Sequence, residues 1–152
     1  MNFHVSESEA YTRVLADLLD KCQMPSNKIH KGLKFLITLR GVPIGGARLI
    51  LSENKKTAYV ASVCILEEFR GIKAGYFLMK HMHAEATAMG VSKIYLASVG
   101  TAVNFYKALG YLPVDVKHAV PAEFLKPMHA IWKEYKSGKY PYRIEHYLYL
   151  LV

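Results

Sequence analysis

A basic turn that contains two glycines, Arg70–Gly75, is the stretch of this sequence best suited to chemistry. It follows an almost wholly apolar run, Tyr59–Leu66, of the kind that forms a central strand covered on both faces. It precedes a segment with helical spacing, Tyr76–Met89. Free main-chain N–H groups at a helix N-terminus attract anions, and the helix dipole adds to the attraction. The sequence therefore predicts a phosphate or pyrophosphate site whose donors are the amides of Gly71–Tyr76.

An aromatic pair, Phe105 and Tyr106, is the second candidate for chemistry. A tyrosine with a pKa of about 10 keeps its proton at neutral pH, so it can donate that proton to a leaving group within about 3 Å. The same residue would also serve as a core aromatic that packs a helix against a sheet, and both interpretations of Tyr106 stay open. Phe105 is interpreted as a core residue in either case.

No general base stands out in the sequence. Glu67 and Glu68 follow the apolar run and could order a water molecule that takes up a proton, although loop acids are usually solvated. His118, at the end of a predicted strand, is a further candidate for a base or a substrate contact.

The elements that must position these residues begin with a meander of strands. A helix is predicted over Glu7–Cys22, with a capping box at Ser6–Glu9 in which Ser6 is the N-cap. Gly45 and Gly46 indicate a bulge or a close backbone approach. The strands predicted in this half are Asn2–Val5, Leu33–Arg40, Ile44–Ser52 and the strand that starts at Thr57.

The second half alternates helices with strands. The helix after the basic turn ends at Gly90, and the strand that follows it should pair parallel to the Thr57 strand through a right-handed crossover. Thr101 is predicted to cap the next helix. A Pro121 helix is expected to be broken by Pro127. The ranges predicted here are strand Lys93–Ser98, helix Ala102–Leu109, strand Tyr111–Val116, a helix reaching Tyr135 and strand Tyr142–Leu151.

Three stretches together resemble the GCN5-related N-acetyltransferase family, known as GNAT. They are Val63–Ile65, the spacing from Arg70 to Gly75, and the segment Ala102–Tyr111 with its Phe-Tyr-Lys-x-Leu-Gly-Tyr pattern. The resemblance covers Leu33–Val116 well and the two ends by layout. It implies an α/β fold with a mixed, mostly antiparallel central sheet flanked by helices. A helical insertion of about twenty-five residues then precedes the last strand.

The resemblance also implies a function: an acetyl-CoA-dependent N-acetyltransferase in which a primary amine attacks the acetyl group directly. Tyr106 would protonate the departing thiolate of coenzyme A. Val63, Cys64 and Ile65 would offer main-chain groups to the pantetheine arm and the acetyl carbonyl. The acceptor, a small-molecule or peptide amine, is not identified. The cofactor-binding residues implied are Val63, Cys64, Ile65, Arg70, Gly71, Ile72, Lys73, Ala74, Gly75, Tyr76 and Asn104.

Two departures from the family pattern leave a rival interpretation open. Lys73 stands where the first glycine of the family's central motif is expected, and Val99 stands where an asparagine is usual. Asn104 is expected to replace that asparagine in part. A chain that had lost the cofactor site would be a structural or interaction module on the same fold.

Length and composition limit the number of domains and the kinds of partner that the chain can have. A chain of 152 residues suits a single domain, 1–152. The net charge of +8 would suit a nucleic-acid partner, but the lysines are spread along the chain, so this partner is not favoured. No apolar run approaches the ~20 residues that span a bilayer, and no signal peptide is evident, so we expect no membrane partner and a cytoplasmic location.

Cysteine and histidine usage predicts no metal site. Cys22 and Cys64 are interpreted as reduced core thiols. His81 and His83 lie two residues apart on a helix, point to different faces and are interpreted as surface residues. An exposed apolar stretch, Tyr147–Leu151, could pair across a homodimer.

Overall fold

The computed structural model describes residues 2–152, and its centre is one seven-stranded sheet in the order β1-β2-β3-β4-β5-β7-β6. Only β4 and β5 pair parallel; every other neighbouring pair is antiparallel. The mixed, mostly antiparallel α/β sheet predicted from the sequence is confirmed. The strands are β1 Phe3–Glu7, β2 Leu33–Leu39, β3 Val42–Leu51, β4 Thr57–Ile65, β5 Lys93–Val99, β6 Leu112–Pro113 and β7 Ile144–Leu151.

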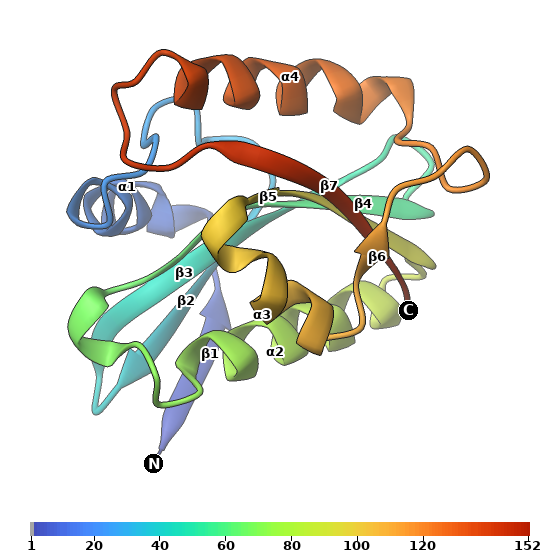
Figure 1. The fold of residues 1–152 in the computed structure, drawn as a ribbon. Helices are drawn as coiled ribbons and strands as arrows, with labels where there is room; N and C mark the ends of the chain where they lie inside the picture. Colours follow the sequence, from blue (N-terminus) through green and yellow to red (C-terminus); the bar gives the residue numbers. More distant parts are fainter. Residues whose placement is uncertain (1) are drawn as a thin grey trace.

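Helices cover both faces of the sheet (Figure 1). One face packs against α2 and α3, through a core that includes Val60, Leu78, Met82 and Ile94. The other face packs against α1 near β2 and β3 and against α4 near β5 and β7. The helices are α1 Thr12–Lys21, α2 Ala74–Ala88, α3 Val103–Ala108 and α4 Ala122–Lys136, with 3-10 turns at Glu9–Tyr11, Glu67–Phe69 and Gly100–Ala102. No helix in the described range is both long and apolar enough to cross a bilayer.

The two parallel strands separate part-way along their length. Thr57–Val60 pairs with Lys93–Leu96, and beyond this point β5 pairs only with β7. The edge of Ala61–Ile65 that faces β5 has no strand partner within residues 2–152. The sheet is therefore open beside the C-terminal half of β4.

A β-bulge in β4 marks the start of this opening. Ser62 and Val63 together face Ala47, because the register moves from Arg48 opposite Ala61 to Gly46 opposite Cys64. Ser62 has a φ of 59°, which is unusual for a residue with a side chain. A Cβ at Gly45 would collide with the carbonyl oxygen of Cys64. Both features predicted from the glycine pair, a bulge and a close backbone approach, are present.

The first helix starts later than its predicted capping box. Ser6 belongs to β1, and its hydroxyl lies 2.8 Å from that of Tyr11. Ser8 is the N-cap, and its hydroxyl accepts from the amide of Ala10 at 3.1 Å. The prediction of Ser6 was wrong because β1 continues to Glu7, where it pairs with β2.

Three predictions in the second half also need correction. Thr101 caps no helix, since it lies within the 3-10 turn that precedes α3. The strand predicted over Tyr111–Val116 is reduced to β6, and the Asp115 side chain then accepts from the amide of His118 at 2.8 Å. Pro127 does not break α4, which continues from Ala122 to Lys136 with the proline inside it. The proline removes only the one main-chain bond that would reach the carbonyl of Glu123.

The final strand is not a free edge. β7 pairs with β5 on one side and with β6 on the other, and the amide of Val114 also donates to the carbonyl of Tyr147 at 3.0 Å. Pairing of Tyr147–Leu151 across a dimer would have to displace β6.

His83 is buried on α2, which corrects its prediction as a surface residue. Its Nε2 lies 2.9 Å from the hydroxyl of Tyr111. Burial, with a contribution from Lys80, lowers the pKa of His83 to about 4. Between about pH 6.5 and pH 4, His83 is therefore protonated in the unfolded chain and neutral in the folded chain.

We expect the contribution of His83 to the free energy of unfolding to be complete above about pH 6.5 and to be lost progressively as the pH falls towards 4. The loss from His83 alone is at most about 3 kcal/mol. His83→Gln keeps a partner for Tyr111 and removes the titration, so denaturant unfolding of this variant should depend less on pH in that range. Equal pH slopes for variant and wild type would contradict the assignment.

Candidate active site

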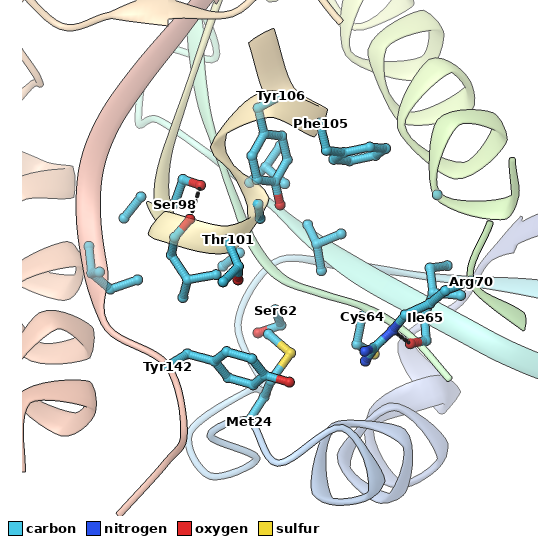
Figure 2. Close-up of a pocket in the computed structure, with 18 of the residues that line it drawn as sticks. Met24, Ser62, Cys64, Ile65, Arg70, Ser98, Thr101, Phe105, Tyr106 and Tyr142 are labelled. Carbon is cyan, nitrogen blue, oxygen red and sulfur yellow. Dashed lines mark hydrogen bonds between the residues drawn. The ribbon is translucent and has the colours of Figure 1, made fainter. Parts of the chain in front are cut away.

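The opening between β4 and β5 is a cavity of about 680 Å³. Figure 2 shows Tyr106 and Phe105 of α3 on one side and Ser62, Met24 and Tyr142 on the other. Within the described chain, its lining includes three cationic side chains, Arg48, Arg70 and Lys73, and no Asp, Glu or His. The cavity is therefore apolar in its middle and positively charged at particular points.

The basic turn presents unpaired main-chain donors, as the sequence predicts. The amide of Arg70 donates to the carbonyl of Glu67, and the helical pattern resumes where Phe77 donates to Lys73. Between these two bonds, no acceptor within residues 2–152 is bonded to the amides of Gly71–Tyr76. These donors lie at the N-terminus of α2, where the helix dipole also favours an anion.

Lys73 gives this turn its shape. It adopts the left-handed conformation, with a φ of 68°, directly before the first residue of α2. Gly71 is also left-handed, with a φ of 83°. The Lys73 side chain is exposed, and its ammonium group can only donate, so it does not occupy the free amides. The lysine thus takes the backbone conformation that the family's glycine would provide.

Arg70 is tied to the end of β4. Its Nε donates to the carbonyl of Ile65 at 2.9 Å (Figure 2). The thiol of Cys22 lies 3.5 Å from the same oxygen. Cys22 and Cys64 are free and buried, as predicted. The neighbouring Cys64 thiol, together with Arg70, lowers the pKa of Cys22 to about 7. The Cys22 thiol and burial raise the pKa of Cys64. This thiol pair packs α1 against the strand that lines the cavity.

Tyr106 reaches the cavity from α3. The residue is 7% exposed, and Figure 2 shows its hydroxyl directed into the space between the strands. Burial, with a smaller effect of Cys64, raises the pKa of Tyr106 well above that of a free tyrosine. The raised pKa keeps the Tyr106 hydroxyl protonated at neutral pH, and no hydrogen bond to another described residue holds it, so the group is available to donate.

Gly75 brings α2 and α3 together. A Cβ at this position would lie 3.2 Å from the ring of Phe105. Phe105 in turn packs on Tyr106 with ring centroids 5.1 Å apart. Gly75 therefore supports Tyr106 through Phe105, in addition to presenting its own amide.

Two residues of the implied cofactor set do not line the cavity. Ile72 packs against the core beneath the turn, so only its amide is available. Asn104 is exposed on α3, two residues from Tyr106 and therefore on a different face of the helix. The expectation that Asn104 replaces the usual asparagine finds no support in its position.

The candidate bases are also outside the cavity. Glu67 and Glu68 are exposed to solvent in the 3-10 turn after β4. His118 stacks on Tyr149 with ring centroids 4.2 Å apart, and its buried Nδ1 has no partner in the described chain. None of the three lines the cavity.

The model of the Acetyltransferase (GNAT) family matches residues 3–111. The chain belongs to the GNAT family. The uncharacterized N-acetyltransferase CgeE of Bacillus subtilis strain 168 is 34% identical over 86 residues, which cover 55% of this chain and 33% of CgeE. The chain thus spans about a third of the length of that curated relative.

Solved GNAT structures share the fold across nearly the whole chain. An acetyltransferase from Staphylococcus aureus Mu50 superposes with a TM-score of 0.72 at 14% identity, covering 99% of both chains. N-acetylglutamate synthase from Neisseria gonorrhoeae, solved with coenzyme A and L-arginine, gives 0.71 at 13% identity, covering 99% of this chain and 33% of that one.

Sequence reasoning on this GNAT chain missed several cavity residues. Ser98 lines the cavity from β5, and its hydroxyl donates to the carbonyl of Val99 at 2.8 Å. Tyr135 approaches from α4. Arg48 could have been identified from the sequence, because it is a cation inside the otherwise apolar strand β3.

The left-handed Lys73 leads to a stability prediction. Lys73→Gly should change the free energy of unfolding by less than about 1 kcal/mol, since relief of the strained backbone offsets the greater freedom of the unfolded chain. Lys73→Val should cost about 1–2 kcal/mol, because a β-branched residue tolerates this conformation poorly. Denaturant unfolding checks both, and equal stability of the valine variant would contradict the conformation.

Proposed function

We propose that this chain is an N-acetyltransferase that moves an acetyl group from acetyl-CoA to a primary amine by direct attack. The observation that carries the proposal is the row of unpaired amides at Gly71–Tyr76 beside the unpaired edge of β4. The row of amides suits the pyrophosphate of coenzyme A. The unpaired edge of β4 suits the pantetheine arm, which contains amide groups. Coenzyme A is bound in solved GNAT structures from Neisseria gonorrhoeae and Mycobacterium tuberculosis.

Different residues bind three parts of acetyl-CoA: the pyrophosphate, the pantetheine arm and the acetyl carbonyl. The amides of Gly71–Tyr76 bind the pyrophosphate, and the side chains of Arg70 and Lys73 add positive charge near it. The open edge at Val63–Ile65 holds the pantetheine arm and the acetyl carbonyl. The cavity fits this group, because two of its cations, Arg70 and Lys73, lie at the turn and its middle is apolar.

Tyr106 supplies the proton that the departing sulfur needs. Acetyl-CoA brings an activated thioester. The amine nitrogen forms a bond to the carbonyl carbon, the carbon–sulfur bond breaks, and the Tyr106 hydroxyl protonates the sulfur. The nitrogen loses one proton, which returns through water to the Tyr106 oxygen. Charge and atoms balance without a carboxylate or imidazole base, in keeping with a cavity that has neither.

Binding of the donor is the first test. Isothermal titration of the wild-type chain with acetyl-CoA should give a dissociation constant in about the micromolar to submillimolar range, and inorganic pyrophosphate should compete. Lys73→Asn keeps a residue that tolerates the left-handed backbone and removes the charge, so affinity should fall by about two- to fivefold. Absence of binding would instead favour the structural or interaction module.

The proton donor is tested separately. Tyr106→Phe should lower turnover by about 100-fold or more, while the affinity for coenzyme A stays within about twofold. Tyr111→Phe is the matched control, because Tyr111 is also a buried tyrosine but its hydroxyl bonds to His83 away from the cavity. Release of free coenzyme A with a panel of amines gives the rates.

The raised pKa of Tyr106 also predicts how turnover depends on pH. A donor with a pKa above the usual value stays protonated at high pH, so wild-type turnover should not decline between pH 8 and pH 10 from loss of this proton. Unchanged turnover in Tyr106→Phe would remove Tyr106 from the mechanism and leave acetyl transfer itself in place.

A further inference from the structure

Arg48 is a buried cation without an anionic partner. It lies in the middle of β3, is 7% exposed and faces the side of the sheet covered by α1 and α4. The one ion pair within residues 2–152 joins His81 and Glu85, so no carboxylate lies within salt-bridge distance of Arg48. A buried charge that lacks a partner is costly, and such residues usually have an anion to bind.

The guanidinium group is held in place by neutral oxygens. Nε donates to the hydroxyl of Ser62 at 3.0 Å, and Nη1 donates to the carbonyl of Lys31 at 3.1 Å. These bonds use two of the five N–H donors of arginine. Nη2 has no partner in the described chain and is not sealed from solvent, and Arg48 lines the cavity. The unused donors therefore open to the cavity.

The position of Ser62 relates this cation to the proposed reaction. Ser62 directly precedes Val63, the first of the residues whose main chain is proposed to hold the acetyl group. Figure 2 shows Ser62 beside Met24 and Tyr142, across the cavity from Tyr106 and Phe105. Through its bond to Ser62, Arg48 belongs to the side of the cavity lined by Met24 and Tyr142.

The groups around Arg48 do not neutralise it. The nearby Tyr59 is buried, which raises its pKa to about 12, so its hydroxyl is uncharged. The remaining neighbours in this part of the cavity are neutral: Met24, Pro25, Ile131, Tyr135 and Tyr142. Within residues 2–152 the lining has no carboxylate that would pair with a second ammonium group on an acceptor.

We propose that Arg48 binds a carboxylate of the acceptor, so that the acceptor is a small amine that also carries a carboxylate, of the amino-acid type. This inference rests on the proposed acetyl transfer. The amine of such a molecule, a few bonds from its carboxylate, reaches the acetyl carbon while the carboxylate stays on Nη1 and Nη2. Polyamines and other acceptors with several positive charges are disfavoured, because the lining has three cations and no carboxylate within residues 2–152.

Lys34 serves as a control for the possibility that Arg48 acts only by supporting the structure. Lys34 lies directly opposite Arg48 in the β2–β3 register and is 3% exposed. Its ammonium group donates to the carbonyls of His30 at 2.8 Å and Gly32 at 3.3 Å, in the same loop that Arg48 holds through Lys31. Lys34 does not line the cavity. Both cations support the loop, but only Arg48 can touch a ligand.

The experiment compares amino acids with their primary amides, which have the same amine and no carboxylate. In the presence of coenzyme A, α- and β-amino acids should raise the melting temperature of the wild-type chain and their amides should not. With acetyl-CoA, kcat/KM should favour an acid over its amide by about 30- to 150-fold.

Arg48→Met should abolish this preference, mainly through KM, and leave coenzyme A affinity unchanged. Arg48→Lys should keep part of the preference. Lys34→Met should lower stability and keep the preference in full.

The outcomes separate the two proposals. Failure of acetyl-CoA to bind the wild-type chain overturns the proposed function. If acetyl-CoA binds but amides stabilise the chain or react as well as acids, the carboxylate inference is overturned and acetyl transfer stands. If Lys34→Met removes the preference as Arg48→Met does, the arginine acts by supporting the loop, and the inference is again overturned.

Discussion

One extra residue in β4 is the constraint on which the rest of the structure depends. Because Ser62 and Val63 together face Ala47, the alternation of side chains is displaced by one position beyond the bulge. Tyr59 and Ala61 face α4, whereas Val63 and Ile65 face α2. Without the bulge, residues 59, 61, 63 and 65 would share one face. The bulge also coincides with the end of pairing to β5, so the open edge and the change of face begin together.

This displacement sets the chemistry of the two sides of the cavity. Towards α2, β4 runs on through the 3-10 turn Glu67–Phe69 to the basic turn and its free amides. Towards α1 and α4, the bulge brings the Ser62 hydroxyl within 3.0 Å of the Arg48 guanidinium. Positive charge therefore lies at both ends of a cavity whose lining contains no acid or histidine in the described range. Such a field favours anionic groups at both ends and a neutral amine between them, which is the form that can attack a carbonyl.

Local pattern and spacing predicted most of the fold and the basic turn. The apolar run before Arg70 and the helical spacing after it place a strand, a turn and a helix, and no long-range information is needed to expect free amides there. Arg48 could not be assigned in the same way. Its role depends on which residue of β4 lies opposite it, and the register of a bulged pair cannot be read from one strand alone.

Other errors had similar long-range causes. His83 occupies a position that helical spacing places beside Tyr76 and Lys80, yet it is buried because Tyr111 follows α3 and packs on it. Asn104 was expected to replace in part the asparagine that Val99 displaces, but the short helix α3 turns it towards solvent. Ser8 replaces Ser6 as the helix cap because pairing with β2 extends β1.

Lys73 shows what the glycine motif of this family requires physically. A glycine at this position provides a left-handed backbone and leaves room for a phosphate near the amides. Lys73 adopts the same backbone with a φ of 68°, at a cost of about 1–2 kcal/mol for a residue with a side chain. Its side chain is exposed and so leaves the amides uncovered. The requirement is therefore a backbone conformation with free donors, and the absence of a side chain is only the commonest way to meet it. A lysine that meets it also adds a mobile positive charge next to the donors, which glycine cannot do.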